Sequence, residues 1–197
     1  MDFERLGAGA LPSDTIALAR ALIGLVLVAE SPEGRVVGRI VETEAYPLRD
    51  PASHAYIGQR SRNAAMFLEP HRAYVYLIYG TSYCFNVTSE PHGHGAAVLV
   101  RALEPLDGLA LMERRRGTQR TGDLARGPGR LTQALGIDRR HDGCDLIGGS
   151  ELWLARGAEP GVIGTSKRIG ISKAASRRLR FYERGSPFVS GPKHLSP

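Results

Sequence analysis

The sequence predicts one α+β domain, residues 1–197, with a curved and mainly antiparallel β-sheet, a protruding β-hairpin and peripheral helices. The chain has 197 residues, 42% of them hydrophobic, which suits one compact domain with a substantial core. Short apolar segments alternate with turns that contain glycine or proline, as expected for antiparallel strands. Three segments have a helical pattern, and we expect them at the periphery of the sheet.

Each predicted element follows from a local pattern. Ser13 is a favourable N-cap for the first helix, and Gly136 closes the last one. Residues 47–70 combine prolines with polar residues and predict an irregular segment over the sheet, where loops often carry function. In order, the expected elements are a helix over 14–22, strands over 25–29 and 35–46 joined by a turn at 31–34, the irregular segment, a hairpin of 74–79 and 83–87, a strand over 96–103, helices over 106–116 and up to 135, and strands over 151–155 and 179–182.

Residues 40–46, Ile-Val-Glu-Thr-Glu-Ala-Tyr, place ionisable groups in a strand that is otherwise apolar. Strand side chains alternate between two faces, so Glu42, Glu44 and Tyr46 share one face. Two residues along a strand span roughly 6–7 Å, and one carboxylate at that distance raises the pKa of the other if both are shielded from water. The functional interpretation is a general base, and the structural alternative is a solvated acidic edge strand.

The positive charge of the chain is carried almost entirely by arginine. The formal net charge is +6, and the only lysines are Lys167, Lys173 and Lys193. An arginine-rich surface suits a polyanionic partner because the guanidinium group binds phosphate with two parallel hydrogen bonds. Arg101 is different, since it interrupts the apolar strand over 96–103. A guanidinium group there needs a carboxylate, carbonyl or phosphate, and we expect a glutamate on a neighbouring strand.

Several classes of protein are disfavoured by what the sequence lacks. Cys84 and Cys144 form no Cys-x-x-Cys pair, which argues against a disulfide framework or a zinc ribbon. His92 and His94 have no partner cluster, so we expect no metal. No signal-peptide pattern and no apolar run of about 18 residues is present. We therefore expect an intracellular protein without membrane contact.

The predicted hairpin has an aromatic tip. Tyr79 directly precedes the tight turn at Gly80. An exposed tyrosine beside such a turn can insert between bases, as apolar side chains of minor-groove proteins do. The structural alternative is a hairpin whose tyrosines only pack in the core. Residues 126–130, Arg-Gly-Pro-Gly-Arg, also precede a short helix whose first backbone amides can hold a phosphate.

Taken together, these motifs are specific. The first group comprises Val-Glu-Thr-Glu-Ala-Tyr at 41–46, His54, Ser-Arg-Asn at 61–63 with Met66 and Phe67, Tyr-Val-Tyr-Leu-Ile-Tyr-Gly at 74–80, and Asn86. The second comprises Val-Arg-Ala-Leu-Glu-Pro-Leu at 100–106, Gly127-Pro128, Arg-Phe-Tyr at 180–182 and Arg-Gly-Ser-Pro at 184–187. With these motifs in this order, the chain resembles the alkyladenine (3-methyladenine, methylpurine) DNA glycosylase family from about residue 18 to residue 190.

The resemblance implies a monofunctional DNA repair enzyme without a metal or organic cofactor. Such an enzyme flips an alkylated or deaminated purine, of the 3-methyladenine, 7-methylguanine, hypoxanthine and ethenoadenine class, out of the duplex and hydrolyses its N-glycosidic bond. Glu44 matches the family's general base, which activates water, and Arg101 matches the arginine that helps to position this water. Glu42 has no role in the family pattern, and we expect it to form a structural ion pair.

The resemblance also implies how the lesion and the DNA are bound. Tyr46, His54 and Tyr76 match the rings that stack on the flipped base, and Asn86 matches the residue that discriminates against normal guanine. Stacking tolerates many bases, which suits a broad range of lesions. Tyr79 matches the hairpin residue that fills the gap left in the duplex. Further DNA contacts are expected at Arg62, Met66 and Arg130.

Two features depart from the family pattern. The segment between Tyr46 and His54 is slightly shorter than in the family. The loop over residues 88–97, which contains His92 and His94, is individual to this chain. We therefore expect a lesion preference that differs from that of better-known relatives.

Two other functions fit parts of the same pattern. A carbohydrate glycosidase also uses paired carboxylates beside aromatic platforms, although the net charge and the arginine-rich surface argue against it. A non-catalytic minor-groove or RNA-binding module would bind through Tyr79 and the arginines, with a structural Glu44. The partner expected for the glycosylase is double-stranded DNA that contains damaged purines, bound by a monomer in the cytoplasm or at the nucleoid.

Overall fold

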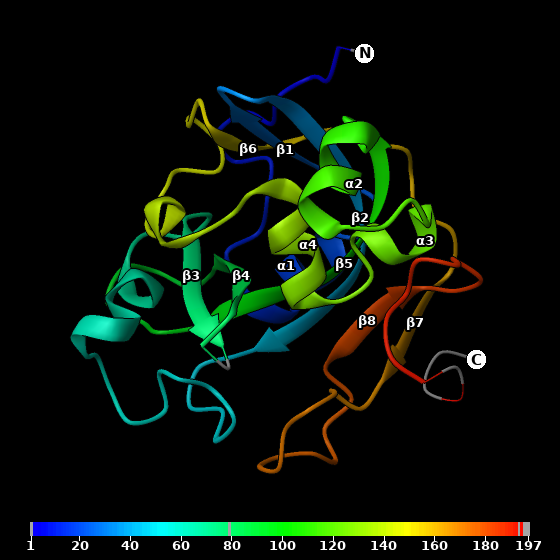
Figure 1. Ribbon diagram of the computed structural model, residues 1–197. Helices are drawn as coiled ribbons and strands as arrows, with labels where there is room; N and C mark the ends of the chain where they lie inside the picture. The colour runs from blue at the N-terminus through cyan, green and yellow to red at the C-terminus, as the bar shows by residue number, and fades with distance from the viewer. Residues whose placement is uncertain (1, 79, 193, 195–197) are drawn as a thin grey trace.

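An antiparallel β-sheet with short helices around it forms the protein (Figure 1). The computed structural model describes residues 2–78, 80–192 and 194. The strands are β1 (Val26–Ser31), β2 (Gly34–Tyr46), β3 (Ala73–Ile78), β4 (Ser82–Thr88), β5 (Ala97–Asp107), β6 (Leu152–Ala155), β7 (Ile163–Ser166) and β8 (Arg180–Glu183). The helices are α1 (Thr15–Ala21), α2 (Leu109–Arg116), α3 (Thr121–Leu124) and α4 (Pro128–Leu135), with 3-10 helices η1 (Ser61–Phe67) and η2 (Arg139–His141).

The strand order is β3-β4-β5-β2-β1-β6, and β8 pairs with both β2 and β7 outside this path. Every strand pair is antiparallel. The predicted hairpin is the β3–β4 pair, although its tip residue Tyr79 lies outside the described residues. The predicted α+β class, with an antiparallel sheet and peripheral helices, is confirmed.

Strand β2 is the one on which the sheet is built, because it pairs with three others. Strand β5 follows one edge of β2 along most of its length. On the other edge, β1 pairs with the first part of β2, and β8 pairs with residues 42–44. Glu42 and Glu44 therefore lie between two hydrogen-bonded strands, and both are 0% exposed. The alternative of a solvated acidic edge strand is wrong.

Side-chain alternation gives the sheet two different faces. One face is apolar and packs against α1 and α4 in the main hydrophobic core, where Thr43 donates a hydrogen bond to the Ala19 carbonyl in α1 at 2.7 Å. The strand residues in this core include Ala45, Val75, Phe85, Val87, Val98 and Val100. The residues between them form the opposite face, where Glu44 pairs with Leu99, Leu99 with Asn86, and Asn86 with Tyr74. This row across four strands thus brings Glu44, Asn86 and Tyr74 to one face of the sheet, with Leu99 between the first two.

A β-bulge sets the direction of Arg101. Glu42 pairs with Ala102, whereas the next residue, Thr43, pairs with Val100, so Arg101 is an extra residue on β5. A bulge redirects the side chain of the extra residue and is common beside functional sites. Here it places the Arg101 side chain with the carboxylates of β2, although Arg101 belongs to a strand that is apolar on both sides of it.

One predicted helix begins later than expected, and one strand of the structure was not expected. The helix expected over 106–116 begins only at Leu109, because β5 continues to Asp107 and Gly108 separates strand from helix with a φ of 72°. A Cβ atom on Gly108 would lie 2.3 Å from the Arg35 carbonyl oxygen, so only glycine fits this turn. Strand β7 was not expected, because its four residues include Gly164 and carry little apolar pattern.

Close packing of β7 on β8 leads to a first prediction. A Cβ atom on Gly164 would lie 2.6 Å from the ring of Tyr182, which is buried and has no room to move. We expect Gly164→Ala to lower the free energy of unfolding by about 1–3 kcal/mol because of this overpacking. Urea denaturation measures the change. Gly122→Ala in α3 is the control, since nothing lies within 4 Å of its Cβ position, and an equal loss in both variants would contradict the packing argument.

Candidate active site

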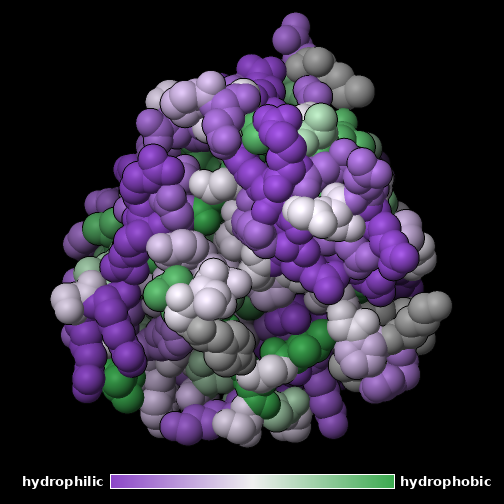
Figure 2. Space-filling view, in the orientation of Figure 1, coloured by the Kyte–Doolittle hydropathy of each residue, from purple (hydrophilic) through white to green (hydrophobic). Residues whose placement is uncertain are grey.

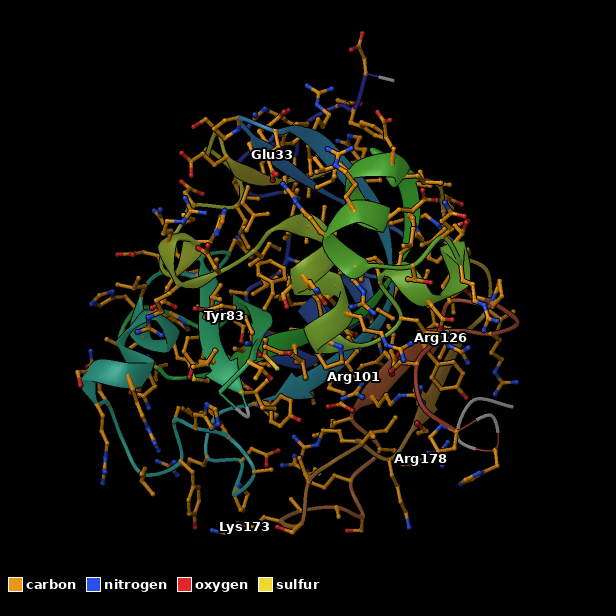
Figure 3. The ribbon with its side chains drawn as sticks, in the orientation of Figure 1. Glu33, Tyr83, Arg101, Arg126, Lys173 and Arg178 are labelled. Carbon is orange, nitrogen blue, oxygen red and sulfur yellow. The ribbon has the colours of Figure 1, made fainter. Side chains whose placement is uncertain are left out.

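A cavity of about 930 Å³ opens on the polar face of the sheet. Its wall combines strand residues with residues from the loop after β2, from η1, from the start of α4, from η2 and from the loop after β7. Figure 2 shows hydrophobic residues on the lower part of the molecule, below a mostly hydrophilic surface over α2 and α3. Arg101 lies near the centre of the molecule in the same view, whereas Lys173 and Arg178 lie on peripheral segments (Figure 3).

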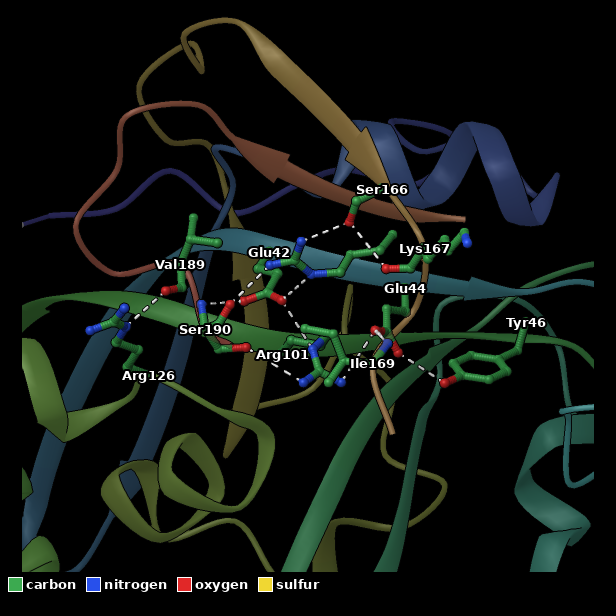
Figure 4. Close-up of polar contacts among 11 residues, drawn as sticks. Glu42, Glu44, Tyr46, Arg101, Arg126, Ser166, Lys167, Ile169, Val189 and Ser190 are labelled. Carbon is green, nitrogen blue, oxygen red and sulfur yellow. Dashed lines mark hydrogen bonds and ion pairs between the residues drawn. The ribbon is translucent and has the colours of Figure 1, made fainter. Parts of the chain in front are cut away.

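Glu44 is completely buried, and it does not itself line the cavity. Figure 4 shows its polar contacts. Its Oε1 accepts a hydrogen bond from the backbone N–H of Ile169 at 2.8 Å and lies 3.3 Å from Nη1 of Arg101. Its Oε2 accepts a hydrogen bond from the Tyr46 hydroxyl at 2.9 Å. All three partners, Tyr46, Arg101 and Ile169, line the cavity. The carboxylate is therefore one residue away from the cavity and held in a fixed orientation.

Burial raises the pKa of Glu44 above the ordinary value of a glutamate. The positive charge of Arg101 opposes the shift most strongly, followed by the Ile169 N–H and the Tyr46 hydroxyl, and the negative charge of Glu42 adds to it. The net effect is a carboxylate that takes up a proton more readily than a glutamate in water does. This property is required of a general base.

Glu42 has a different environment, although it lies on the same strand. Its Oε1 accepts hydrogen bonds from Nε of Arg101 at 3.0 Å and from Nε of Arg180 at 2.6 Å. Its Oε2 accepts one from the backbone N–H of Ser190 at 2.6 Å. Two arginines and a backbone amide thus bind this carboxylate, as expected for a structural ion pair. The expectation that Arg101 finds a glutamate on a neighbouring strand is also confirmed.

Aromatic rings gather at one end of the cavity. His54 packs edge-on against Tyr76 with ring centroids 4.5 Å apart, and Tyr76 stacks on Tyr74 at 5.3 Å. The Nδ1 atom of His54 lies 2.9 Å from the Tyr74 hydroxyl, which fixes the plane of the imidazole ring. Burial, and then the nearby charge of Arg62, lowers the pKa of His54. The structure thus brings His54, Tyr76 and Tyr46 to one cavity.

Three other predicted residues also line the cavity. Asn86 is buried, and its side-chain Nδ2 donates to the Tyr74 carbonyl at 3.0 Å. Met66 is buried in a small cluster with Tyr74 and belongs to the wall of the cavity rather than to the outer surface. Arg62 is exposed at the cavity.

One of the residues predicted to bind DNA lies away from the cavity, and one is outside the described residues. Arg130 is exposed on α4, is not part of the cavity wall and forms an ion pair with Asp123 at 3.0 Å. Tyr79 lies outside the described residues. Within the described ranges, no three His, Cys, Asp or Glu side chains come together as a metal site would require. In the same part of the chain, no helix has the length and hydrophobicity needed to cross a bilayer.

Sequence reasoning missed two buried arginines near the site, Arg180 beside Glu42 and Arg168 beside Asp50. Arg180 and Arg168 are both buried, and Arg168 forms an ion pair with Asp50, which is also buried. The sequence did carry a signal for Arg180, because it lies between Leu179 and Phe181 in a predicted strand. A cation flanked in this way needs a buried anion. For Arg168 and Asp50, which are distant in sequence, no local pattern points to the pairing.

The Glu42 cluster leads to a second prediction. We expect Glu42→Gln to lower the free energy of unfolding by about 3–5 kcal/mol, because it leaves Arg101 and Arg180 buried without their full counter-charge. Urea denaturation at pH 7 measures the effect. The exposed Glu151→Gln provides the control and should change the stability by less than about 0.5 kcal/mol. Equal stabilities of the two variants would show that Glu42 is not a structural ion pair.

The raised pKa of Glu44 leads to a third prediction, about stability. Because the folded chain binds this proton more tightly than the unfolded chain, folding loses stability as the pH rises from about 4.3, the ordinary glutamate pKa, through the raised value. Glu44→Gln removes this loss. We expect the melting temperature of the variant, relative to the parent, to be higher at pH 8 than at pH 5. A difference that is constant or that falls with pH would contradict the raised pKa.

Comparison with known proteins shows the family of this chain. A family model described as "Methylpurine-DNA glycosylase (MPG)" matches residues 10–187. Three curated relatives carry the name "Putative 3-methyladenine DNA glycosylase". The one from Mesorhizobium japonicum is 57% identical over 195 residues, which cover 98% of this chain and 94% of that protein. The relative from Paraburkholderia phytofirmans is 53% identical over 188 residues, 94% of this chain and 87% of that protein. The one from Rubrobacter xylanophilus is 47% identical over 176 residues, which cover 89% of this chain and 92% of that protein.

The predicted enzyme class, a DNA glycosylase with DNA as its partner, is thereby confirmed, and this chain belongs to the methylpurine-DNA glycosylase family.

Proposed function

We propose that this chain is a monofunctional glycosylase that removes alkylated or deaminated purines from double-stranded DNA. The lesions belong to the class of 3-methyladenine, 7-methylguanine, hypoxanthine and ethenoadenine. The observation that carries the proposal is Glu44, a buried carboxylate with a raised pKa, fixed directly behind an aromatic cavity. The glycosidic bond of a stacked purine is out of reach of such a buried group, so the base must be flipped into the cavity.

The aromatic rings support binding of a flipped purine. Tyr46, His54 and Tyr76 come from three separate segments and meet at the same cavity. Stacking on an aromatic ring contributes roughly 1–3 kcal/mol per base and depends little on the identity of the base. Asn86 adds a polar group to the cavity wall, where it can discriminate between purines by hydrogen bonding. The exposed Arg62 at the cavity and the exposed Arg130 on α4 are suited to phosphate contacts, and Tyr79 keeps its predicted role at the hairpin tip.

Glu44 can serve the reaction in two ways. As the bond between C1′ and the purine nitrogen breaks, positive charge develops on the sugar, and a nearby carboxylate stabilises it. Water then forms the new bond at C1′, and its proton passes to Glu44. Arg101, 3.3 Å from Glu44, is placed to orient this water. An alkylated purine that is already cationic leaves as a neutral base, whereas hypoxanthine needs a proton to do so.

Two features of the site favour this reaction over related ones. A carbohydrate glycosidase uses two working carboxylates, but Glu42 is bound by Arg101, Arg180 and Ser190, and of these three only Arg101 lines the cavity. A lyase that forms a Schiff base needs an amine nucleophile. Among the described residues, no lysine lines the cavity. Hydrolysis by an activated water is therefore the reaction that fits the site.

Single-turnover kinetics test this proposal. The parent, Glu44→Gln and the exposed control Glu151→Gln are each mixed in excess with duplex DNA that contains one lesion, and the released base is measured. We expect Glu44→Gln to reduce release by about 100-fold or more, the usual contribution of a general base, while it still binds DNA. The control should match the parent. Binding without release by the parent, for every lesion of the class, would instead support the non-catalytic binding module.

A further inference from the structure

A second buried ion pair lies next to Glu44. Arg168, whose side chain is 0% exposed, donates from Nη2 to Asp50 at 3.1 Å and from Nη1 to the Ala45 carbonyl at 2.9 Å. Asp50 is also 0% exposed and accepts a hydrogen bond from the Ala52 N–H at 2.8 Å. The pair thus connects the loop after β7 to the end of β2 and to the turn that leads to His54.

Arg168 reaches Glu44 by two routes. Its guanidinium carbon lies 4.5 Å from the centre of the Tyr46 ring, and the Tyr46 hydroxyl donates to Oε2 of Glu44. The residue after Arg168 is Ile169, whose backbone N–H donates to Oε1 of Glu44. Both oxygens of the carboxylate are therefore held by groups whose positions depend on Arg168.

Stability alone does not explain this arrangement. Removing two charges from water is unfavourable, and a buried ion pair is often no more stabilising than apolar residues of similar size. In addition, the buried Nε of Arg168 has no hydrogen-bond partner among the described residues. A guanidinium group placed only to satisfy its donors would not take this position. Its position does fit a cation stacked on an aromatic face.

We propose that Arg168, anchored by Asp50, is a positioning residue for base excision: it holds Tyr46 and Ile169 against Glu44 and so keeps Glu44 ionised and oriented. The inference rests on the proposed function of Glu44. Physically, the positive charge of Arg168 opposes the rise in the pKa of Tyr46 that burial and the charge of Glu44 produce. A more acidic hydroxyl donates a stronger hydrogen bond to a carboxylate, and that bond lowers the pKa of Glu44.

Of the charged and titratable side chains around Glu44, only Tyr46 has a described contact with Arg168. The charged and titratable groups that surround Glu44 are Arg101 and Cys84 from neighbouring strands, Glu42 and Tyr46 from its own strand, and Arg180 from β8. Arg101 opposes the raised pKa of Glu44 more strongly than Tyr46 does, so the shift produced at Arg168 should be partial.

Arg177 provides a matched control. It also binds Asp50, at 3.0 Å, but its side chain is 44% exposed, and no contact joins it to Tyr46 or Glu44 among those described. Substitution of either arginine removes one partner of Asp50. Only substitution of Arg168 removes the cation from the Tyr46 ring.

The test compares the pH dependence of single-turnover release in the parent, Arg168→Met and Arg177→Met, with melting temperatures recorded for each. We expect Arg168→Met to slow release about tenfold at pH 6 and less at pH 8, because the acidic limb of its profile moves to higher pH. Arg177→Met should have the same release rate as the parent and the same acidic limb of the pH profile. If Arg168→Met does not fold, Arg168→Lys takes its place, with a smaller shift in the same direction.

Tyr46→Phe separates positioning from general damage. It should move the limb in the same direction as Arg168→Met, and the double variant should show no further shift, since both act through one hydrogen bond. A folded Arg168 variant with the limb of the parent, or a loss of rate without any shift, would overturn the proposal. So would shifts that add in the double variant.

A readout without activity separates this proposal from the proposed function. The titration of Glu44 is followed by NMR of the carboxyl carbon in protein labelled at glutamate, with the signal assigned by its absence in Glu44→Gln. We expect the signal to titrate at higher pH in Arg168→Met than in Arg177→Met. If the parent releases no base, the proposed function fails. The role of Arg168 is overturned separately, if the Glu44 signal titrates at the same pH in Arg168→Met as in the parent.

Discussion

The position of Arg101 between two buried carboxylates is the constraint on which the rest of the structure depends. A guanidinium group that is almost entirely buried must be neutralised and hydrogen-bonded, because an unpaired buried charge is strongly destabilising. Glu42 and Glu44 meet this need from one strand, at 3.0 and 3.3 Å. The arrangement requires β2 in the interior of the sheet, a bulge in β5, and β8 on the far edge. The same three features bury Glu44 and place Arg101 beside it at the wall of the cavity.

The two glutamates show how environment separates roles on one strand. Glu42 is bound by two arginines and a backbone amide, which occupy most of the acceptor sites of its carboxylate. Glu44 has one arginine at a longer distance and otherwise neutral donors. Burial then dominates, and its pKa is raised. The same residue type thus serves structure at one position and is suited to proton transfer two residues later.

Much of this arrangement was predictable because it depends on local pattern. Period-two alternation placed Glu44 and Tyr46 on one face of β2, and the apolar strand around Arg101 predicted its glutamate partner. The β3–β4 hairpin and α4 follow from turn and capping residues. The roles of individual site residues, and the single domain, remain predictions.

The remaining features depend on contacts between distant parts of the chain. Asp50 and Arg168 are 118 residues apart, and Glu42 and Ser190 are 148 apart. No window of sequence contains both partners, and the short strand β7 has too weak a pattern to reveal itself. The bulge at Arg101 likewise appears only when β2 and β5 are aligned.

The change of partner along β2 has a consequence for how the protein is made. The first part of β2 pairs with β1, which precedes it in the chain. Residues 42–44 pair with β8, and Glu44 accepts a hydrogen bond from Ile169, both of which are synthesised much later. A ribosome produces Ile169 125 residues after Glu44, when the hairpin and the aromatic residues of the cavity have already been synthesised. Glu44 therefore gains its Ile169 hydrogen bond and its second neighbouring strand only after the other strands of the cavity have been synthesised, and the candidate site is complete only when the loop after β7 and β8 are in place.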